Sequence, residues 1–356
     1  MKSVIVSDLH IGELSHGFVD SDTSLNSRML DIFKRFNTLI KHCLKNDISN
    51  IIIAGDVYDL KTPKNLIRKN FAKLVNKTIK AGIKLYILIG NHDISSTSGH
   101  ALVEMEELEI KGLMIISTPQ TISIDNVDFS FFPWNPFSNQ DLNHSELIKL
   151  KTDKTVLIGH FSTTKTMIEP NNVDFVFLKS LNFDLVFLGH IHKYEELASG
   201  IYHISSFTRT DFNEEDEMQY IVEFDHDTFE YDFVEFPDRV FQTFSYDNNI
   251  SFLKFKNDIE KADLSKKITR MHVVIEENDE LHDEIDKLTV YVKNNSWKFY
   301  GITKDIIQLN NSFTLTEKVT PNIAFKIYCE ENIDSIGERY FKDCYNAGIE
   351  ILQEGS

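Results

Sequence analysis

The sequence lacks several features that would each define a class of protein. No apolar run reaches the roughly 18 residues that a membrane-spanning helix requires, so we expect no membrane partner. The three cysteines, Cys43, Cys329 and Cys344, have no metal-binding spacing and an odd count, which predicts a reducing compartment and no disulfide. An apolar strand begins directly at Met1, so we expect no signal peptide. Together these features predict a cytoplasmic protein of a bacterial cell or a phage-infected host.

Other absences concern ATP and nucleic acid. The sequence contains no GxxxxGK[ST] phosphate loop, so any dependence on ATP must come from another protein. A positive charge surplus is also absent, because the net charge is -18, whereas a protein that binds nucleic-acid phosphates normally presents basic residues. Eleven of the acids lie within residues 213–238, so much of the negative charge is local.

What the sequence does contain is a series of five short acid and histidine clusters, each placed directly after an apolar run that predicts a buried β-strand. The clusters are Asp8-Leu9-His10, Gly55-Asp56-Val57-Tyr58-Asp59, Gly90-Asn91-His92-Asp93, Gly159-His160 and Gly189-His190-Ile191-His192. Strand ends are where an open α/β sheet gathers its site residues, and glycine there lets backbone and ligands come close. One such cluster alone fits an ordinary turn, but five in order after strands predict a functional site.

The clusters supply a mixed set of oxygen and nitrogen donors. The candidate ligands are Asp8, His10, Asp56, Asn91, His160, His190 and His192. This set is typical of two neighbouring divalent cations, since one mononuclear site would leave several ligands unused. A carboxylate can bridge two cations, so Asp56 is the natural shared ligand, and the uncharged Asn91 completes coordination without adding negative charge. The predicted chemistry is in-line attack on phosphorus.

The motif order DxH, GDxxD, GNHD, GH and GHxH resembles the calcineurin-like metallophosphoesterase superfamily. The final GHxH, the length and the tail resemble its DNA double-strand-break repair nuclease branch, which includes SbcD-like proteins and phage recombination endonuclease subunits. The motif resemblance covers residues 1–210, and beyond them it is architectural only. The resemblance implies an α/β fold with a four-layer αββα sandwich core, a small β-α-β capping domain and a C-terminal helical tail.

The resemblance also implies a role for each site residue. One cation would be held by Asp8, His10, Asp56 and His192, and the second by Asp56, Asn91, His160 and His190. Such enzymes are usually manganese-dependent, so two Mn²⁺ ions are expected, with Mg²⁺ as the alternative. His92 would be the catalytic histidine, which stabilises the developing phosphorane charge or protonates the leaving 3' oxygen. Asp59 would orient His92 through a hydrogen bond from its carboxylate, which favours imidazolium.

Two interpretations stay open for the segment 61–85, which contains eight basic residues and no acid. Apolar residues at helical spacing predict an amphipathic helix over 64–81. Its lysine face is either an ordinary solvated surface or a surface that faces DNA. The relatives dimerise through helices in this region and after the GNHD motif, so a homodimer is expected. The residues that would then lie in either the interface or the core are Ile67, Phe71, Ala101, Leu102 and Met105.

The predicted organisation has three parts. A nuclease domain covers 1–245, in which strands alternate with helices that include 25–45, 64–81 and 98–110. A capping domain covers 246–315 and a helical tail 316–356. We predict a linker-like stretch at 248–267, followed by a strand at Met271–Ile275, a helix at Asp279–Lys293 and an extended return at Trp297–Ile307. Two short tail helices, at 321–331 and 334–352, either close the cap or dock on the coiled coil of an SbcC-like ATPase.

The function that the resemblance implies is that of a manganese-dependent DNA nuclease subunit in repair and recombination. It would act as a 3'–5' exonuclease on double strands and as an endonuclease on single strands and hairpins, together with the SbcC-like ATPase. The residues themselves predict only phosphate-ester hydrolysis. One alternative is a phosphomonoesterase such as a protein phosphatase, but those relatives carry an arginine clamp where this chain has Leu60 and Lys61. The other is a non-catalytic scaffold on the same fold, although scaffold members usually lose ligands that are all present here.

Overall fold

The computed structural model describes most of the chain up to residue 307. The described residues are 1–95, 99–137, 139–152, 154–163, 172–247, 249–276 and 280–307. Nearly all of them belong to one compact unit, residues 1–273 and 280–305. A second unit consists of 274–279 and 306–356, of which only 274–276 and 306–307 are described. The predicted tail helices lie outside the described residues.

The first sheet has six strands in the order β14-β13-β1-β2-β3-β6. Their bounds are β1 Lys2–Val6, β2 Ile48–Ile53, β3 Lys84–Leu88, β6 Leu113–Ile116, β13 Tyr220–Asp225 and β14 Tyr231–Glu235. β1, β2, β3 and β6 run parallel, whereas β13 is antiparallel to β1 and to β14. The segments that come after the parallel strands therefore meet at one edge of the sheet.

The second sheet also has six strands, in the order β11-β12-β10-β9-β8-β7. Their bounds are β7 Gln120–Ile124, β8 Val127–Phe132, β9 Thr155–His160, β10 Leu185–Gly189, β11 Glu195–Ala198 and β12 Ile201–His203. β8, β9, β10 and β12 are parallel, and the outer strands β7 and β11 are antiparallel to their neighbours. The carboxyl ends of β9 and β10 carry the two later predicted clusters.

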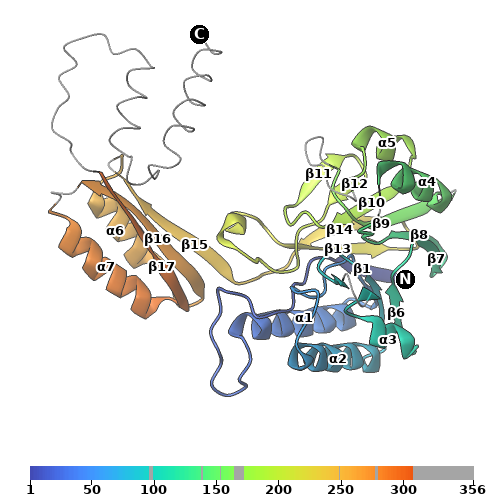
Figure 1. Cartoon of the computed structure of the whole chain (residues 1–356), viewed down its shortest axis with the longest axis horizontal. Coiled ribbons are helices and arrows are strands. Elements are labelled where there is room, and N and C mark those ends of the chain that lie inside the picture. The colour runs from blue at the N-terminus through green and yellow to red at the C-terminus, as the bar shows by residue number, and fades with distance from the viewer. Residues whose placement is uncertain are drawn as a thin grey trace, which may run out of the picture. The chain divides into compact units, whose positions relative to one another are not determined.

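Alternation along the strands builds the layers. In β1, Ile5 packs into an apolar layer between the two sheets, while Val4 and Val6 belong to the cluster under the helices of the first sheet. A third cluster, which includes Leu157 and Leu188, joins the outer face of the second sheet to its own helices. Figure 1 shows α1 and α2 on one side of the strands and α4 and α5 on the other. The predicted four-layer αββα sandwich is confirmed.

The helices of the sandwich follow the amphipathic segments of the sequence. Their bounds are α1 Ser27–Lys45, α2 Asn65–Lys80, α3 Val103–Glu107, α4 Gln140–Leu150 and α5 Phe175–Ser180. The predictions for α1 and α2 are confirmed, and Asn26 caps α1 by accepting from the backbone N–H groups of Arg28 and Met29. The helix predicted at 98–110 is shorter, because Gly99–His100 pairs as β5 with β4, Ile94–Ser95. None of the described helices is both long and apolar enough to cross a bilayer.

A third sheet of three strands has the order β15-β16-β17. The strands are β15 Val240–Tyr246, β16 Lys267–Glu276 and β17 Lys298–Ile307, and the helices are α6 Phe252–Lys261 and α7 His282–Asn295. The stretch predicted as linker-like holds α6, in which Phe255 and Ile259 are buried. β15 pairs with β16, so the third sheet begins at Val240, and the predicted boundary between residues 245 and 246 stays a prediction.

Candidate metal centre

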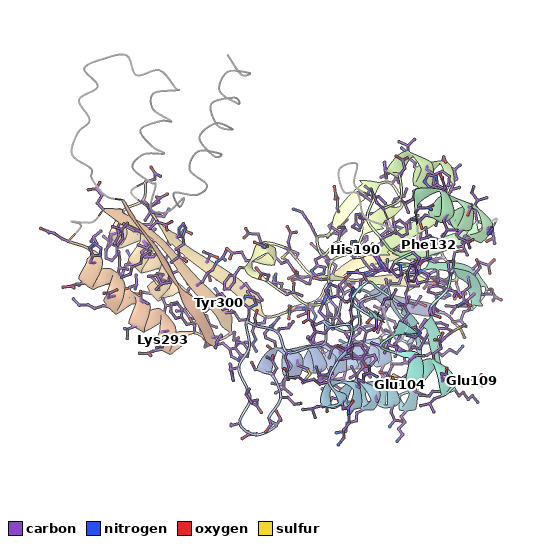
Figure 2. The ribbon with its side chains drawn as sticks, in the orientation of Figure 1. Glu104, Glu109, Phe132, His190, Lys293 and Tyr300 are labelled. Carbon is purple, nitrogen blue, oxygen red and sulfur yellow. The ribbon has the colours of Figure 1, made fainter. Side chains whose placement is uncertain are left out.

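The predicted ligands lie at the carboxyl ends of five strands. Asp8 and His10 follow β1, Asp56 follows β2, Asn91 follows β3, His160 ends β9, and His190 and His192 follow β10. Figure 2 labels His190 at the end of β10. An isolated parallel bridge between Ser7 and Ser206 links the end of β1 to the segment after β12. The structure therefore brings together side chains from segments that are far apart in the sequence.

Three of these side chains form a first group. The ligand atoms of Asp8, His10 and His192 all lie within 4.8 Å of one another. The Nε2 atoms of the two imidazoles are 3.0 Å apart, and His192 Nε2 lies 3.7 Å from Asp8 Oδ1. Two imidazole nitrogens that converge beside a carboxylate form a donor set for a divalent cation.

A second group contains Asp56, His160 and His190, whose ligand atoms also lie within 4.8 Å of one another. Asn91 joins this group, because its Oδ1 lies 3.0 Å from His160 Nε2 and 2.9 Å from His190 Nδ1. An amide oxygen that faces two imidazole nitrogens completes a mixed nitrogen and oxygen donor set. The members of each group are drawn from one of the two predicted ligand sets, and Asp56 is the residue named in both sets.

Asp56 lies between the two groups. Its Oδ2 is 3.3 Å from His160 Nε2 and 3.8 Å from His10 Nε2. Its Oδ1 accepts a hydrogen bond from the backbone N–H of His92 at 2.8 Å, which fixes the orientation of the carboxylate. The Oδ2 carboxylate oxygen therefore faces both groups.

Backbone strain concentrates at the same residues. Asp8, His10, Asp56 and His190 all have positive φ values, of 53°, 45°, 48° and 85°. Such a conformation costs a non-glycine residue about 1–3 kcal/mol, and strain of this kind clusters at functional sites. Of these four, Asp8, His10 and Asp56 are at most 3% exposed, whereas His190 is half-buried.

Two glycines allow the groups to approach. A Cβ atom on Gly55, whose φ is 99°, would lie 2.0 Å from His160 Nδ1, and one on Gly90 would lie 2.1 Å from Asp56 Oδ1. Neither position can hold a side chain without moving a predicted ligand. The glycines of the GD and GN motifs are therefore required by close packing around the donors.

Hydrogen bonds outside the cluster set the imidazole tautomers. His160 Nδ1 donates to the carbonyl oxygen of Ala54 at 2.7 Å, and His192 Nδ1 donates to Glu214 Oε1 at 2.9 Å. In both rings the Nε2 atom is the one that faces the cluster. Ligating histidines in metalloproteins are held in this way by an acceptor on the far nitrogen.

Charge shapes the ionisation of these groups. Burial alone would lower the pKa of His160, but the Asp56 carboxylate raises that pKa to about 9. Burial likewise opposes charge on Asp56, yet His160 and His10 hold the pKa of this carboxyl far below its ordinary value. The donors of the cluster therefore carry a local negative charge that a proton or a cation balances.

The predicted hydrogen bond between His92 and Asp59 is present, but its acceptor was predicted wrongly. His92 Nδ1 donates to the backbone carbonyl oxygen of Asp59 at 2.8 Å, whereas the Asp59 carboxylate lies 3.6 Å from His10 Nδ1. A carbonyl oxygen accepts but does not donate, so this contact places a proton on Nδ1 of His92. The spacing of the GDxxD motif could not distinguish the two acceptors.

Sequence reasoning assigned no role to three residues around the site. Asp93 is fully buried and accepts from the backbone N–H groups of Val57, Tyr58 and Gly90, which ties the two central loops together. Burial and the neighbouring Asp56 raise the pKa of Asp93. The ring of Trp134, which lies just after β8, is 5.0 Å from that of His190. Glu214 was counted only as part of an acidic segment, and no spacing connects it to His192.

Two other histidines, His16 and His203, lie outside the predicted ligand set. His16 is buried among the rings of Phe212, Phe241 and Tyr300. His203 is fully buried, and its Nε2 lies 3.4 Å from Thr163 Oγ1. Neither belongs to a metal-binding group within the described part of the chain.

Two packed mixed sheets with aspartate, asparagine and histidine donors at their strand ends define a metal-dependent phosphoesterase. The model of the calcineurin-like phosphoesterase family matches residues 1–194, and the chain belongs to this family. The fold is that of the metallophosphoesterases, whose members use divalent metals.

Three curated proteins show which members the chain is similar to. It is 31% identical over 113 residues to the DNA double-strand break repair protein Mre11 of Aeropyrum pernix, covering 31% of this chain and 25% of that protein. It is 23% identical over 191 residues to Mre11 of Saccharolobus solfataricus, covering 52% and 48%. It is 24% identical over 217 residues to exonuclease subunit 1 of Enterobacteria phage T4, covering 58% and 61%. In each case the chain spans less than two thirds of the relative.

Proposed function

We propose that this protein is a DNA nuclease that hydrolyses phosphodiesters with two divalent cations. The observation that carries the proposal is the convergence of seven donors in two groups with Asp56 between them. The names of the Mre11 and phage T4 relatives support DNA as the substrate and repair or recombination as the context. Manganese is the proposed ion, with magnesium as the alternative.

The donors present fit such a pair of cations. Asp8, His10, His192 and Asp56 would hold one ion, and Asp56, Asn91, His160 and His190 the other. Bound there, divalent cations supply Lewis-acid polarisation of the phosphate ester and a more acidic water. The protein's own contribution is to hold these donors in place, through the strained backbone of the loops and through acceptors on the far imidazole nitrogens.

His92 is the proposed catalytic residue. Its Nδ1 donates to the Asp59 carbonyl, which leaves Nε2 as the atom free for substrate, and its ring centroid lies 4.8 Å from that of His10. Half-exposed beside the buried donors, the ring can donate from Nε2 only when that nitrogen is also protonated, and the imidazolium then gives a proton to the leaving 3' oxygen or a hydrogen bond to the transition state. Asp59 is proposed to position both His92, through its carbonyl, and His10, through its carboxylate.

The two residues after Asp59 favour a diester substrate over a monoester. Phosphatase relatives carry an arginine clamp there, whereas this chain has Leu60, which is 56% exposed, and then Lys61. A terminal phosphate dianion needs such a fixed bidentate donor more than a diester does. Comparing the hydrolysis of bis-p-nitrophenyl phosphate and p-nitrophenyl phosphate in manganese separates the two candidates. A strong preference for the monoester would favour the phosphatase alternative.

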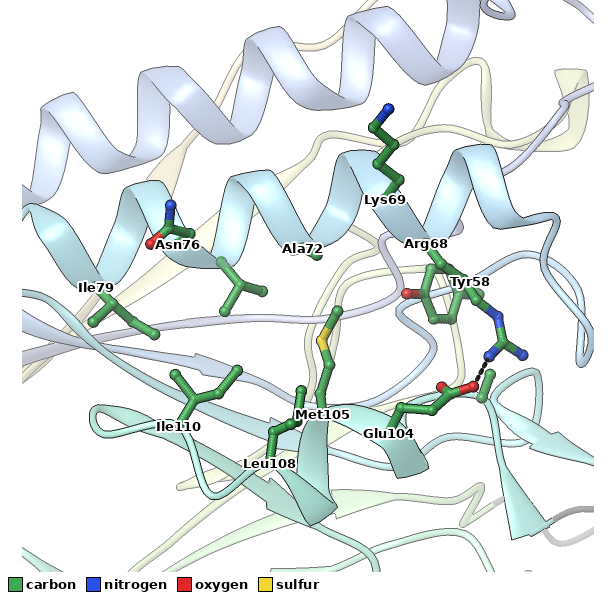
Figure 3. Close-up of a pocket in the computed structure, with 12 residues that line it drawn as sticks. Tyr58, Arg68, Lys69, Ala72, Asn76, Ile79, Glu104, Met105, Leu108 and Ile110 are labelled. Atoms are coloured by element: carbon green, nitrogen blue, oxygen red, sulfur yellow. Dashed lines mark hydrogen bonds and ion pairs between the residues drawn. The ribbon is translucent and has the colours of Figure 1, made fainter.

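A homodimer is proposed through the groove between α2 and α3, which Figure 3 shows. The groove has a volume of about 380 Å³. Its apolar lining includes Ala72, Val75, Ile79, Met105 and Leu108. Ile67, Phe71, Ala101 and Leu102, for which interface and core were both open, are buried in the core of the single chain. Leu108 is 69% exposed, so a second copy of the chain would remove apolar surface from water.

The third sheet with α6 and α7 is the proposed capping domain, and the tail is the proposed docking segment for an SbcC-like coiled-coil ATPase.

Both interpretations of the lysine face of α2, a solvated surface and a surface that faces DNA, stay open. Lys64 pairs with Glu13, and Arg68 pairs with Glu104, so part of its charge is neutralised within the chain. We also propose that the protein is cytoplasmic.

End-labelled DNA gives the direct test of the function. The full chain is incubated with duplex and hairpin substrates in manganese, in magnesium and in chelator. We expect shortening of the duplex from its 3' ends and nicking of hairpins, both dependent on the cation. Absence of cleavage on every DNA substrate, with rapid hydrolysis of small diesters, would contradict DNA as the substrate. Copurification with the tail present and deleted tests the ATPase partner.

A further inference from the structure

One carboxylate outside the predicted ligands is held against the metal centre by a full set of hydrogen bonds. Glu214 is the last residue of the 3-10 helix Phe212–Glu214, and its side chain is 12% exposed. Its Oε1 accepts from His192 Nδ1 at 2.9 Å and from Thr210 Oγ1 at 2.6 Å. Its Oε2 accepts from Ser206 Oγ at 3.2 Å and from the backbone N–H of Thr210 at 3.3 Å. Four donors fix this carboxylate in one orientation.

The contact decides which nitrogen of His192 faces the cluster. A carboxylate accepts but does not donate, so Nδ1 of His192 must carry a proton toward Glu214. The lone pair of Nε2 is then available 3.7 Å from Asp8 Oδ1 and 3.0 Å from His10 Nε2. Such an acceptor raises the basicity of a ligating imidazole and fixes the plane of its ring.

The residues before and after Glu214 in the sequence both contact the third sheet. The ring of Phe212 lies 5.0 Å from that of Phe241 in β15 and 4.4 Å from the guanidinium carbon of Arg270 in β16. On the other side, the Glu215 carboxylate accepts a hydrogen bond from Thr243 Oγ1 in β15. Rigid support of this kind keeps a positioning residue within the narrow geometric limits that a metal site needs.

We infer that Glu214 is a positioning residue of the metal centre, which holds His192 as an Nε2 ligand, and that the third sheet stabilises it in that role. The inference rests on the proposed function of the site. It gives one residue of the acidic segment 213–238 a specific task, where the sequence shows only an excess of negative charge.

Manganese binding to the full chain, measured by titration calorimetry, tests the inference without using activity. The wild-type protein is expected to bind two ions. Glu214→Ala is expected to keep one ion at nearly wild-type affinity and to weaken the other by about 10- to 100-fold. Glu214→Gln keeps the shape of the side chain but removes its charge, so its affinity for the weakened ion should lie between those of the wild type and Glu214→Ala. Glu217→Gln is the matched control, because Glu217 lies in the same segment but pairs with the exposed Lys193.

Two further readouts separate positioning from a merely structural role. In ¹⁵N-histidine spectra of the metal-free protein, recorded at a pH where the His192 imidazole is neutral, the ring should be protonated at Nδ1 in the wild type and should lose that preference in Glu214→Ala. Diesterase activity of the variant should return toward the wild-type kcat at high manganese, since every ligand is still present.

The outcomes are distinct. Two ions bound by the wild type and by Glu214→Ala with equal affinity would overturn the role of Glu214 and leave the proposed function intact. No manganese bound by the wild type would contradict the proposed function itself. If Glu214→Ala fails to fold, as judged by circular dichroism, Glu214→Gln and the spectra of its His192 decide, and unchanged affinity with an unchanged tautomer would refute the inference.

Discussion

The Nδ1 atom of His92 donates a hydrogen bond to the backbone carbonyl oxygen of Asp59, while the carboxylate of the same aspartate faces His10 at 3.6 Å. The orientation of His92 is therefore set by the backbone of the loop after β2 and does not depend on the Asp59 side chain.

A pair of substitutions tests this relationship. His92→Asn should lower kcat on DNA or on a small diester by about 10²- to 10⁴-fold, because it removes the proposed proton donor. Manganese affinity should change little, since His92 is not a proposed ligand. Asp59→Ala leaves the carbonyl acceptor in place, so its effect on kcat should be much smaller. Equal losses in both variants would show that the carboxylate matters for the chemistry after all.

Cation binding should depend on pH with a predictable sign. In the metal-free protein, burial acts to lower the pKa of both imidazoles, but Asp56 raises that of His160 to about 9 and Glu214 with Asp8 raises that of His192 to about 9. At neutral pH a cation must therefore displace protons, so apparent affinity should rise with pH by up to about tenfold per unit for each proton displaced.

Calorimetry at pH 6, 7 and 8 in buffers with different ionisation enthalpies measures both the affinity and the protons released. A manganese affinity that is independent of pH would rule out protonated imidazoles in the free site.

The folding stability of the metal-free protein should change with pH in the opposite direction. The raised pKa values of His160 and His192 stabilise the metal-free fold fully below the ordinary value of 6.5, and this contribution is lost as the pH rises through about 9.

The groove between α2 and α3 predicts an effect of charge on assembly. Leu108 is 69% exposed, so Leu108→Lys should leave the fold of the single chain intact while placing a charge in the proposed interface. Sedimentation velocity should show a dimer for the wild type and a shift to monomer for the variant. Leu253→Lys is the control, because Leu253 is 67% exposed on α6 and away from the groove. A wild-type protein that is monomeric at micromolar concentration would contradict the proposed homodimer.

A buried ion network near the start of β15 predicts a large effect on stability. The Asp238 side chain is 3% exposed and lies 3.8 Å from Arg28 Nη2 and 3.5 Å from Arg35 Nη1. Asp238→Asn would leave both guanidinium groups without this countercharge, which should reduce the free energy of unfolding by about 3–5 kcal/mol. Urea denaturation measures the change. Asp227→Asn, at a side chain that is 80% exposed, should stay within about 0.5 kcal/mol of the wild type, and a similar small change for Asp238 would contradict the prediction.

Regular elements with a strong local pattern could be predicted from the sequence. α1 and α2 have apolar residues at helical spacing, and β1, β2 and β3 are short apolar runs. The pattern of apolar residues within each segment therefore predicts whether it is a helix or a strand. The stretch at 248–267 was predicted to be linker-like from a change in composition near Asn248, but it contains α6, in which Phe255 and Ile259 are buried. The start of the third sheet at Val240 depends on pairing with β16, a partner 27 residues further along at Lys267.

The sequence by itself determined the donor types, their order along the chain and their placement after strands, because the ends of parallel strands gather at one edge of a sheet. Tertiary structure alone decided the hydrogen-bond acceptors that orient those donors. Glu214 reaches His192 from 22 residues away, and His92 finds a carbonyl where a carboxylate was expected. A hydrogen bond depends on the distance and direction between donor and acceptor in three dimensions. The spacing of residues along the chain does not specify either of these.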